Sequence, residues 1–466
     1  MEGTVLHCCI AVIQSSSRWL SSPMPDTIIP YPFTLYPSPF PYHEYENACR
    51  MQYGINKLIY RLASNIDLLD SVLLGLVDCD DFVRKLQDIS QQIQNLPYKS
   101  VAEGCIIRTD YMLQTNVNEE HFHKTRLRLI EINTIAVGLG GAAKLMSQWH
   151  NQFISDIDPT LSANLPSNES HDLIINLIYE SWKIYDNVRA IILFVIPARE
   201  FNIGDQILIE NGLMSLNENI FVKHVTFKEI NQHASIDQSG NLYFMTLEVA
   251  VVYYRHGYDP RHFENETIWQ SYLLLESSRS IKIPSIRYHL AGMKCFQMKL
   301  NFTDFLEKVY EHDQQSYYDD YRSVTEESFT IEQAATTDYL RNKIHVDPEG
   351  FYLKQNREGG GSVYCGKLLN DRISEIMEAK QNQRYFVMKR IIPPQYTNII
   401  RSSNGELKEC LTNSELGIFG AVISQGSNIL YSKCGGSLLR SKPCEKIEGG
   451  IASGAGAIDS VILIKD

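Results

Sequence analysis

Two oxygen-bearing side chains, Glu131 and Asn133, stand two residues apart in the strand-like segment 126–135. Residues at i and i+2 of a strand project from the same face, so a carboxylate and an amide oxygen point in one direction. Mg²⁺ prefers such hard oxygen ligands and commonly takes one or two of them beside phosphate oxygens and water. The pair predicts a magnesium site, although a Glu and an Asn at a strand end more often bond to nearby backbone.

A second constellation joins a strand-borne lysine, Lys354, to Glu358 and the triple glycine 359–361. Glycines let backbone N–H groups approach phosphate oxygens closely, and flanking cations neutralise the phosphate charge. No Gly-Lys-Ser/Thr follows at the spacing of P-loop enzymes. The segment therefore predicts a phosphate-binding lid of another kind, with a flexible surface hairpin as the alternative.

A third constellation places Arg440 and Lys442 shortly before the glycine-rich segment 449–456. Such a segment could close over an anionic substrate and exclude water, or it could be a C-terminal tail that closes nothing. A competing motif, Gly138-Leu-Gly140-Gly-Ala-Ala143, fits the dinucleotide pattern G-x-G-x-x-A. No clear second strand ending in Asp or Glu follows about 20 residues later. We therefore interpret these glycines as sites of tight strand-to-helix packing.

The surrounding pattern indicates an α/β or α+β protein. Residues 22–42 are rich in proline, which predicts an extended arm rather than a helix. Two amphipathic helices are expected to follow it, around residues 51–62 and 82–93. Strand-like runs lie at 126–135, 190–196, 247–255, 351–354, 385–392 and 415–424, and residues 425–427 predict a hairpin to 429–431. The polar stretches 162–171 and 313–327 are expected to be solvated connections at lobe boundaries.

Composition narrows the possible functions. The chain has 466 residues, 44% of them hydrophobic, and a formal charge of −12 without a Lys/Arg block, so a nucleic-acid partner is not expected. Apolar runs are too short to span a membrane. The ten cysteines show no CxxC spacing, which favours reduced thiols. Residues 5–13 lack the flanks of a leader, so we expect a cytoplasmic protein, with secretion as the alternative if a leader lies outside this sequence.

Several segments together resemble the family of eukaryotic glutathione synthetases, in the family's order and from about Tyr31 to about Asp459. The matching segments are 32–38, 108–112, 130–135, 255–258, 290–294, 357–361, 414–420 and 438–442. The resemblance implies an ATP-grasp fold with an inserted α/β substrate-binding lobe and a glycine-rich lid. It also implies a homodimer that uses ATP and two Mg²⁺ ions to join γ-glutamylcysteine, or a related γ-glutamyl peptide, to glycine or another amine through an acyl phosphate.

The resemblance also implies boundaries and residue roles. Residues 1–22 would be a variable segment, 23–189 and 295–466 the two parts of the ATP-grasp body, 190–294 the substrate-binding domain and about 330–412 the lid. The metal ligands would be Glu131, Asn133 and Glu358. ATP would contact Lys294, Lys354, Glu358, Gly359, Gly360, Gly361, Met388, Glu415 and Lys442. Substrate would contact Arg108, Asn202, Gln206, Arg255, Tyr258, Arg440, Ile451 and Ala452, and Arg108, Lys354 and Arg440 would be catalytic.

This chain departs from the family pattern mainly where the peptide would bind. The family typically reads Ser-Ala-Ser where this chain has Ala136-Val137-Gly138, so two hydroxyls that would face γ-glutamylcysteine are missing. His256 replaces an aspartate, and Phe201 stands where the family usually has arginine. Other changes lie near the nucleotide: Ser362-Val363 follow the triple glycine, and Lys389-Arg390 replace Glu-Lys. Two hypotheses follow: a ligase whose donor or acceptor has changed, and a nucleotide- or peptide-binding paralog without turnover.

Overall fold

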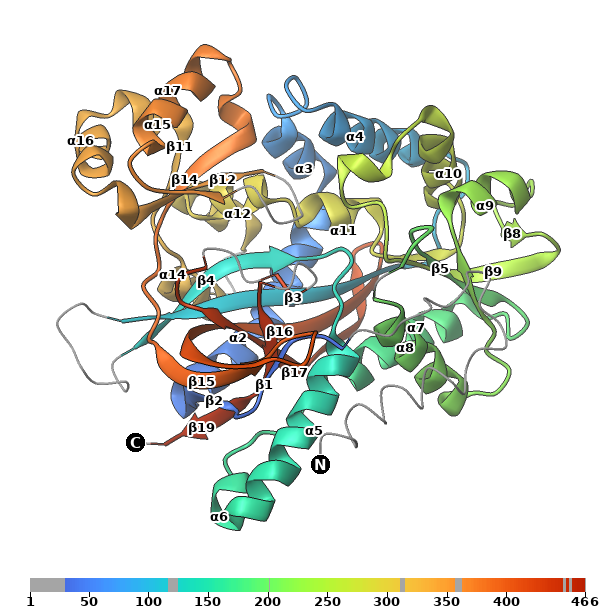
Figure 1. Cartoon of the computed structure of the whole chain (residues 1–466). Helices are drawn as coiled ribbons and strands as arrows, with labels where there is room; N and C mark the ends of the chain where they lie inside the picture. The colour runs from blue at the N-terminus through green and yellow to red at the C-terminus, as the bar shows by residue number, and fades with distance from the viewer. Residues whose placement is uncertain are drawn as a thin grey trace.

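The computed structural model describes residues 30–115, 125–200, 202–310, 315–356, 363–446, 450–451 and 455–465. A mixed sheet of 13 strands runs through the centre of the molecule (Figure 1). Its main path, from one edge to the other, is β15 (Tyr396–Arg401), β1 (Phe33–Thr34), β18 (Ala457–Asp459), β17 (Asn428–Pro443), β16 (Leu407–Gln425), β3 (Glu103–Gln114), β10 (Ile281–Ile283), β9 (Leu247–Tyr254), β5 (Ile191–Val195) and β6 (Val222–Val225). The mixed α/β class expected from the sequence is confirmed.

Three further strands extend this sheet, and helices cover it. β4 (Arg126–Asn133) pairs with β3, while β7 (Ala234–Ile236) pairs with β8 (Leu242–Phe244), which pairs with β9. The long helices are α2 (Tyr42–Ser64), α4 (Asp81–Gln94), α5 (Gly140–Ile157), α7 (Ser170–Tyr185), α8 (Ile203–Leu216) and α10 (Glu266–Glu276). Shorter ones are α3 (Ile66–Leu73), α6 (Pro159–Ser162), α9 (Phe227–His233), α11 (Ile286–Ala291), α12 (Lys294–Leu300) and α13 (Thr303–Val309).

The two faces of the sheet bury different clusters of side chains. β5 reads Ile-Ile-Leu-Phe-Val and is buried throughout, as expected of a parallel strand covered on both sides. Ile191, Leu193 and Val195 join the cluster that includes α2, whereas Ile192 and Phe194 join the cluster that includes α7. The strict alternation follows from the period of two in a strand. A shift of one residue would therefore exchange the two cores.

The predicted arm and amphipathic helices are confirmed in the described residues. The arm supplies β1 and β2 (Ser38–Pro41), and β2 pairs with β19 (Val461–Ile464), near the C-terminus. α2 buries its apolar stripe, including Met51, Ile55 and Leu62. α4 begins where the Asp80 carboxylate accepts hydrogen bonds from the backbone N–H groups of Phe82 and Val83, which satisfies two donors of the first turn.

The predicted hairpin at residues 425–427 is confirmed, but its strands are much longer than expected. β16 and β17 pair from Thr412 opposite Pro443 to Gln425 opposite Asn428. The sequence of β17 contains lysine, serine and two adjacent glycines, so its local strand propensity is low. Its length comes from hydrogen bonding to β16, a long-range partner that residue patterns do not reveal.

A second sheet and its helices form a separate layer at the upper left of Figure 1. The sheet order is β11 (Ser328–Thr330), β14 (Tyr385–Lys389), β12 (Phe351–Gln355) and β13 (Val363–Tyr364). Its core joins residues of the strands to α15 (Ile331–Thr336) and α17 (Leu369–Glu378), and α16 (Asp338–Val346) packs beside them. The layer thus has its own hydrophobic cluster, and its strand β12 carries Lys354.

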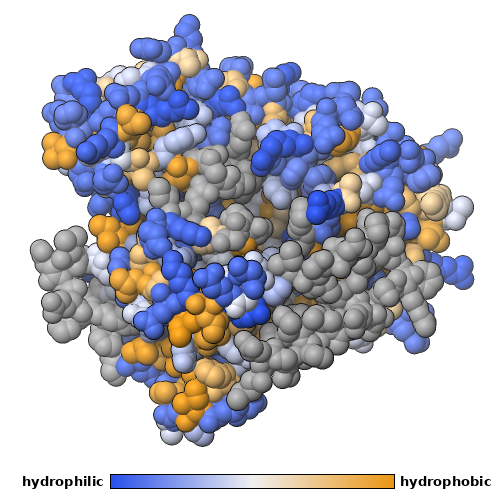
Figure 2. All heavy atoms as spheres, viewed as in Figure 1, coloured by the Kyte–Doolittle hydropathy of each residue, from blue (hydrophilic) through white to orange (hydrophobic). Residues whose placement is uncertain are grey.

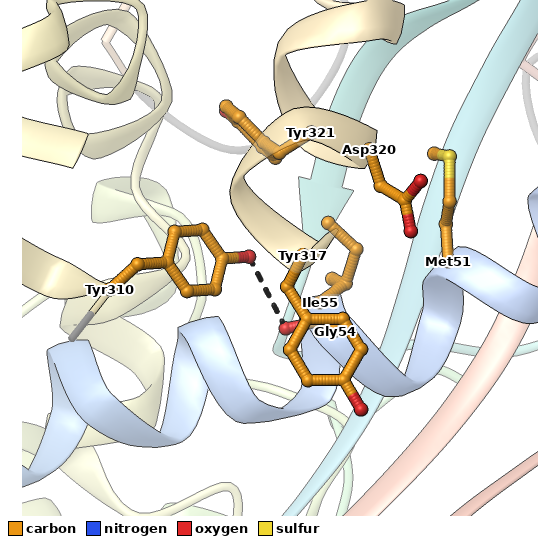
Figure 3. Close-up of a pocket in the computed structure, with 7 residues that line it drawn as sticks. All are labelled: Met51, Gly54, Ile55, Tyr310, Tyr317, Asp320 and Tyr321. Atoms are coloured by element: carbon orange, nitrogen blue, oxygen red, sulfur yellow. Dashed lines mark hydrogen bonds between the residues drawn. The ribbon is translucent and has the colours of Figure 1, made fainter. Parts of the chain in front are cut away.

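One expected connection is a helix. Residues 315–324 of the polar stretch 313–327 form α14 (Gln315–Val324), so that part of the prediction was wrong. Tyr317, Tyr321 and Val324 are spaced for one helical face, and Tyr321 and Val324 are buried while the polar residues face outward. Figure 3 shows α14 against α2, where Tyr317 lies over Gly54: a Cβ at Gly54 would stand 2.8 Å from the tyrosine ring.

The glycines of the G-x-G-x-x-A motif serve packing, as predicted. A Cβ at Gly140 would stand 2.6 Å from Cδ1 of Ile174 on α7, and one at Gly141 would stand 2.8 Å from Cδ1 of Leu208 on α8. The Asp205 carboxylate on α8 accepts hydrogen bonds from the backbone N–H groups of Leu139 and Gly141. Side chains of α7 and α8 therefore occupy the space beside the start of α5, and Asp205 caps its first turn. This leaves little room for a side chain at positions 140 and 141.

Among the described residues on the face shown in Figure 2 the surface is mostly hydrophilic, and one of its apolar groups lies at the bottom of the view, near α6 and the end of α5. Ile157 and Leu161 are exposed there. No helix in the described part of the chain is long and apolar enough to cross a membrane. The eight cysteines within that part are all free, in agreement with the reading of reduced thiols.

We predict that Gly140→Ala lowers the free energy of unfolding. Overpacking against Ile174 should cost about 1 to 3 kcal/mol, which exceeds the gain of at most about 1 kcal/mol from the better helix former. Thermal or urea unfolding measures the difference. Gly435→Ala is the control, because the nearest atom to its added Cβ lies at 3.6 Å and no loss is expected. Equal stability of both variants would contradict tight packing at Gly140.

Candidate active site

The candidate site begins with the antiparallel pair β3 and β4, whose register brings four polar residues to one face. Arg108 lies opposite Asn133, and Asp110 lies opposite Glu131. All four alternate with residues such as Ile107 and Ile132 that enter the core on the other face. Glu131 and Asn133 therefore point the same way, as the sequence predicts. Asp110 is a site residue that the analysis of sequence missed.

Asp110 is fully buried and accepts hydrogen bonds from three side chains. Arg108 donates from Nε to Oδ1 at 2.7 Å and from Nη2 to Oδ2 at 2.8 Å. Asn133 Nδ2 and Arg440 Nη2 each donate to Oδ2 at 2.8 Å. Charge-assisted bonds of this kind are among the stronger ones in proteins. One carboxylate thus fixes two guanidinium groups and an amide, contributed by β3, β4 and β17. The signal that could have revealed it is its spacing of two from Arg108.

Glu131 lies among cations. Lys294 Nζ, at the start of α12, stands 3.2 Å from Glu131 Oε2, and the buried Lys354 of β12 interacts with the same carboxylate. Burial by itself would raise the pKa of Glu131, but Lys294, Lys354, Arg440 and Arg108 lower it well below its ordinary value. Glu131 is therefore ionised, with its oxygen atoms available to ligands. Burial lowers the pKa of Lys354, and the charge of Glu131 opposes that shift.

Glu415 joins the group from β16, directly opposite Arg440 on β17. The two side chains form an ion pair. Burial raises the pKa of Glu415, and the charges of Asp110 and Glu131 add to that effect while Arg440 opposes it. The cations Arg108, Lys294, Lys354 and Arg440 outnumber the carboxylates Asp110, Glu131 and Glu415. The cluster therefore has a net positive charge, which favours the binding of an anionic ligand.

The oxygen donors fit a magnesium ion. Carboxylate oxygens of Asp110, Glu131 and Glu415 lie within 4.8 Å of one another. Asn133 uses its Nδ2 for Asp110 and for the carbonyl oxygen of Arg108, so its amide oxygen is left to act as an acceptor or ligand. The donor set contains only hard oxygens, which is the chemistry that Mg²⁺ selects. Glu358, the third predicted ligand, lies outside the described residues, as do Gly359, Gly360 and Gly361.

An apolar pocket lies beside the charged group, between the two sheets. Ile130, next to Glu131, lines it from β4, Met298 from α12, and Phe386 and Met388 from β14. Gln297, Asn301 and Ser328 add polar atoms at its wall. Apolar walls with a few polar groups are typical of pockets that bind small molecules. Met388, predicted to contact ATP, lines this pocket.

The predicted substrate residues form a second group. Asn202 and Gln206 belong to the first turns of α8 (Asn202 caps it), and Arg255 and Tyr258 follow β9. The Glu200 carboxylate accepts hydrogen bonds from the backbone N–H of Asn202 and from Gln206 Nε2, and Tyr31 OH donates to Asn202 Oδ1 at 2.8 Å. The segment 134–138 joins this group to Asn133, because Arg255 Nη1 donates to the carbonyl oxygen of Val137 at 2.8 Å.

The remaining predicted residues lie near the C-terminus. Lys442 is two residues beyond Arg440 on β17, so its Cβ points to the same face. Ile451 is buried in the core cluster that contains Leu438 and Ile458. Ala452 lies outside the described residues. The structure thus brings together Arg108, Glu131, Asn133, Lys294, Lys354, Glu415 and Arg440, places Asn202, Gln206, Arg255 and Tyr258 in an adjoining group, and sets Met388 in the apolar pocket.

Comparison with known proteins shows the family to which the chain belongs. The sequence model of the ATP-binding domain of eukaryotic glutathione synthase matches residues 4–463. Glutathione synthetase from Homo sapiens is 31% identical over 446 residues, covering 95% of this chain and 92% of the relative. The enzyme from Mus musculus is 30% identical with the same coverage of both chains. The chloroplastic glutathione synthetase from Solanum lycopersicum is 28% identical over 93% of this chain and 78% of its own length.

A solved structure shares the fold. It is a glutathione synthetase-like effector from Globodera pallida in its apo form, with a TM-score of 0.73 and 19% sequence identity over 99% of this chain and 96% of that one. The matching family model describes an ATP-binding domain, and the curated relatives are glutathione synthetases, which are ATP-dependent ligases. The chain is a member of the eukaryotic glutathione synthetase family.

We predict that Asp110→Asn destabilises the protein. The variant leaves Arg108 and Arg440 buried without their shared charge partner, and breaking a buried ion pair costs about 3 to 5 kcal/mol. Urea unfolding measures the loss. Asp81→Asn is the control, because Asp81 is exposed and pairs only with Arg84 on the surface. A loss for Asp110→Asn no larger than that of the control would show that the carboxylate does not hold the site.

Proposed function

We propose that the protein is an ATP-dependent carbon–nitrogen ligase that activates the carboxylate of a γ-glutamyl peptide as an acyl phosphate and joins it to an amine such as glycine. The observation that carries the proposal is the cluster of four cations around ionised Glu131 and the neighbouring amide of Asn133, beside an apolar pocket. That arrangement can bind a nucleoside triphosphate, its metal ion and a second anion at the same time.

The residues of the cluster divide into roles by position. Lys294 and Lys354 flank Glu131 and would neutralise phosphate oxygens, while Met388 would contact the adenine. Arg108 and Arg440 are held in fixed orientation by Asp110, so they would bind the donor carboxylate and stabilise the negative charge that develops during phosphoryl transfer. Mg²⁺, held by Glu131 and Asn133, would supply neutralisation of the phosphate charge when bound.

The donor is proposed to differ from γ-glutamylcysteine or to bind in a different manner. A Cβ at Gly138 would stand 2.6 Å from Arg255 Nη2 and 3.1 Å from Asn202 Nδ2, so a serine cannot occupy that position unless Arg255 moves. Burial and His262 lower the pKa of His256 to about 4, so this imidazole is neutral at pH 7 and does not restore the charge of an aspartate. Each missing neutral hydrogen bond should weaken the peptide by about 0.5 to 1.5 kcal/mol.

A nucleotide- or peptide-binding paralog without turnover is the second candidate. It is favoured by one specific observation: the changed positions 138 and 256 both lie in the group that holds Asn202 and Arg255, on the side of the peptide. A protein that retains its nucleotide site and loses its donor would bind ATP and release no ADP. The two candidates therefore separate in one experiment.

We predict Mg-ATP turnover, measured as ADP release, with glycine and at least one member of a panel of γ-glutamyl dipeptides. Glu131→Gln should reduce that turnover by at least about a hundredfold, because it removes a charged oxygen ligand from a site that stabilises phosphate charge. Glu358→Ala should act in the same direction. ATP affinity, measured by calorimetry, reports binding independently of turnover.

Glu375→Gln is a matched control, since Glu375 pairs with the exposed Arg372 on α17 and belongs neither to the cation cluster nor to the apolar pocket. It should change turnover far less than Glu131→Gln. ATP binding without ADP release for every donor would overturn the ligase proposal in favour of the binding protein. Turnover unaffected by Glu131→Gln would contradict the assigned metal site.

A further inference from the structure

A buried carboxylate, Asp459, lies beneath the strand that carries Arg440. It ends β18, which follows the glycine-rich segment and pairs with β17, so that Asp459 lies opposite Leu439 and Ile458 lies opposite Arg440. The side chain is only 1% exposed. Gly450, in the glycine-rich segment, accepts backbone hydrogen bonds from Ala455 and Gly456. The segment thus returns on itself immediately before the strand that ends in Asp459.

Asp459 accepts hydrogen bonds from two hydroxyls that belong to distant parts of the chain. Ser441 Oγ donates to Oδ2 at 2.5 Å, and Ser38 Oγ donates to the same oxygen at 2.6 Å. The backbone N–H of Ser460 donates to Oδ1 at 2.7 Å. Ser441 Oγ also lies 2.6 Å from Ser414 Oγ. The carboxylate therefore joins the arm, β17 and β18, and through Ser441 it reaches β16.

These hydroxyls occupy the face of the sheet opposite the site. Ser441 lies between Arg440 and Lys442, and Ser414 directly precedes Glu415. The register pairs Ser414 with Ser441, next to the pair of Glu415 with Arg440. Because side chains alternate along a strand, fixing Ser441 from below fixes the backbone from which Arg440 and Lys442 project above.

We propose that Asp459 is a positioning residue: through Ser441 it holds the part of β17 that carries Arg440 and Lys442. The inference rests on the proposed function for its readout by turnover. A position 1 Å wrong at a catalytic group can cost about a hundredfold in rate, so a device of this kind has large effects without touching substrate.

The ionised state of Asp459 costs stability. Burial raises its pKa to about 6, and the hydrogen bonds from Ser38 and Ser441 only partly offset that effect. The native state therefore binds a proton more readily than the unfolded chain, and the stability contribution of this group falls as pH rises from about 4 to about 6. Because the ionised carboxylate costs stability, a role in stability does not explain its presence at this position, whereas a role in function does.

The groups that face Asp459 from the packed elements do not titrate near neutral pH. They are the hydroxyls of Thr34, Ser38 and Ser441, with the Asn398 amide bonded to Ser38 and the Ser414 hydroxyl bonded to Ser441. His150 of α5 lies one residue further, 2.7 Å from Ser460 Oγ, and burial lowers its pKa to about 3. His150 is therefore neutral throughout the range in which Asp459 ionises.

The test is Asp459→Asn, which keeps the shape of the side chain and removes its charge. At pH 7.5 we expect ADP release to fall about tenfold or more, with a thermal midpoint equal to or above that of the wild type. The ratio of wild-type to variant turnover should decline toward one below about pH 6, where the wild-type carboxyl becomes neutral as well. A lower midpoint with unchanged turnover would reduce Asp459 to a structural role and overturn the proposal.

Two serine variants provide the matched comparison, because each removes one donor from the same carboxylate oxygen. Ser441→Ala should reproduce the loss of turnover and should add little to Asp459→Asn in the double variant. Ser38→Ala, on the arm, should leave turnover near the wild-type value. Equal losses in both serine variants would contradict a specific path through β17.

ATP affinity separates this proposal from the proposed function. If the wild type binds ATP and releases no ADP, the ligase proposal fails, and weaker ATP binding by Asp459→Asn and Ser441→Ala but not by Ser38→Ala would still support positioning of Lys442. In that case, unchanged ATP affinity in all three variants would overturn the positioning proposal. A wild type that binds no ATP would overturn both proposals.

Discussion

The hydrogen bonds of one buried carboxylate, that of Asp110, hold together the centre of this protein. Asp110 accepts hydrogen bonds from Arg108 on its own strand, from Asn133 on β4 and from Arg440 on β17, which is 330 residues away in sequence. A buried charge is stable only when it is paired and hydrogen-bonded, so the three strands must meet at this point and in this register. Lys294 and Lys354 interact with Glu131 beside the same cluster. Because Lys354 belongs to β12, this charged contact connects the second sheet to the main sheet, in addition to the hydrophobic core that the second sheet has of its own.

The alternation of side chains along β3, β16 and β17 separates two tasks. One face carries Arg108, Glu415 and Arg440, which are chemically active groups. The other face carries Ser414 and Ser441, whose hydroxyls fix the strands to Asp459 and the arm. A strand pair can serve both purposes only because its register is exact to one residue, and a slip by one would place serines in the site and guanidinium groups in the network below it.

The sequence patterns predicted those features that depend on residues close together in the chain. The pair Glu131 and Asn133, the amphipathic helices and the hairpin at 425–427 all depend on spacing within one segment, and the structure agrees with them. The class of fold and the family followed from motifs in order along the chain. Asp110 was missed because its importance comes from Arg440, which is 330 residues away. The length of β17 and the helix α14 were missed because tertiary partners, rather than local propensity, decide them.

The contrast between the two halves of the site bears on its specificity. The half proposed to bind the nucleotide combines an ion cluster with an apolar pocket, and its members restrain one another through shared charges, so a single substitution there disturbs several partners. The half proposed to bind the peptide consists of Asn202, Gln206 and Arg255, held mainly by Glu200, Tyr31 and the carbonyl oxygen of Val137. These are separate contacts, and Gly138 leaves space that Arg255 occupies. Substitutions can accumulate in such a group without unfolding the centre, which is why a change of donor is physically easier to reach here than a change of nucleotide.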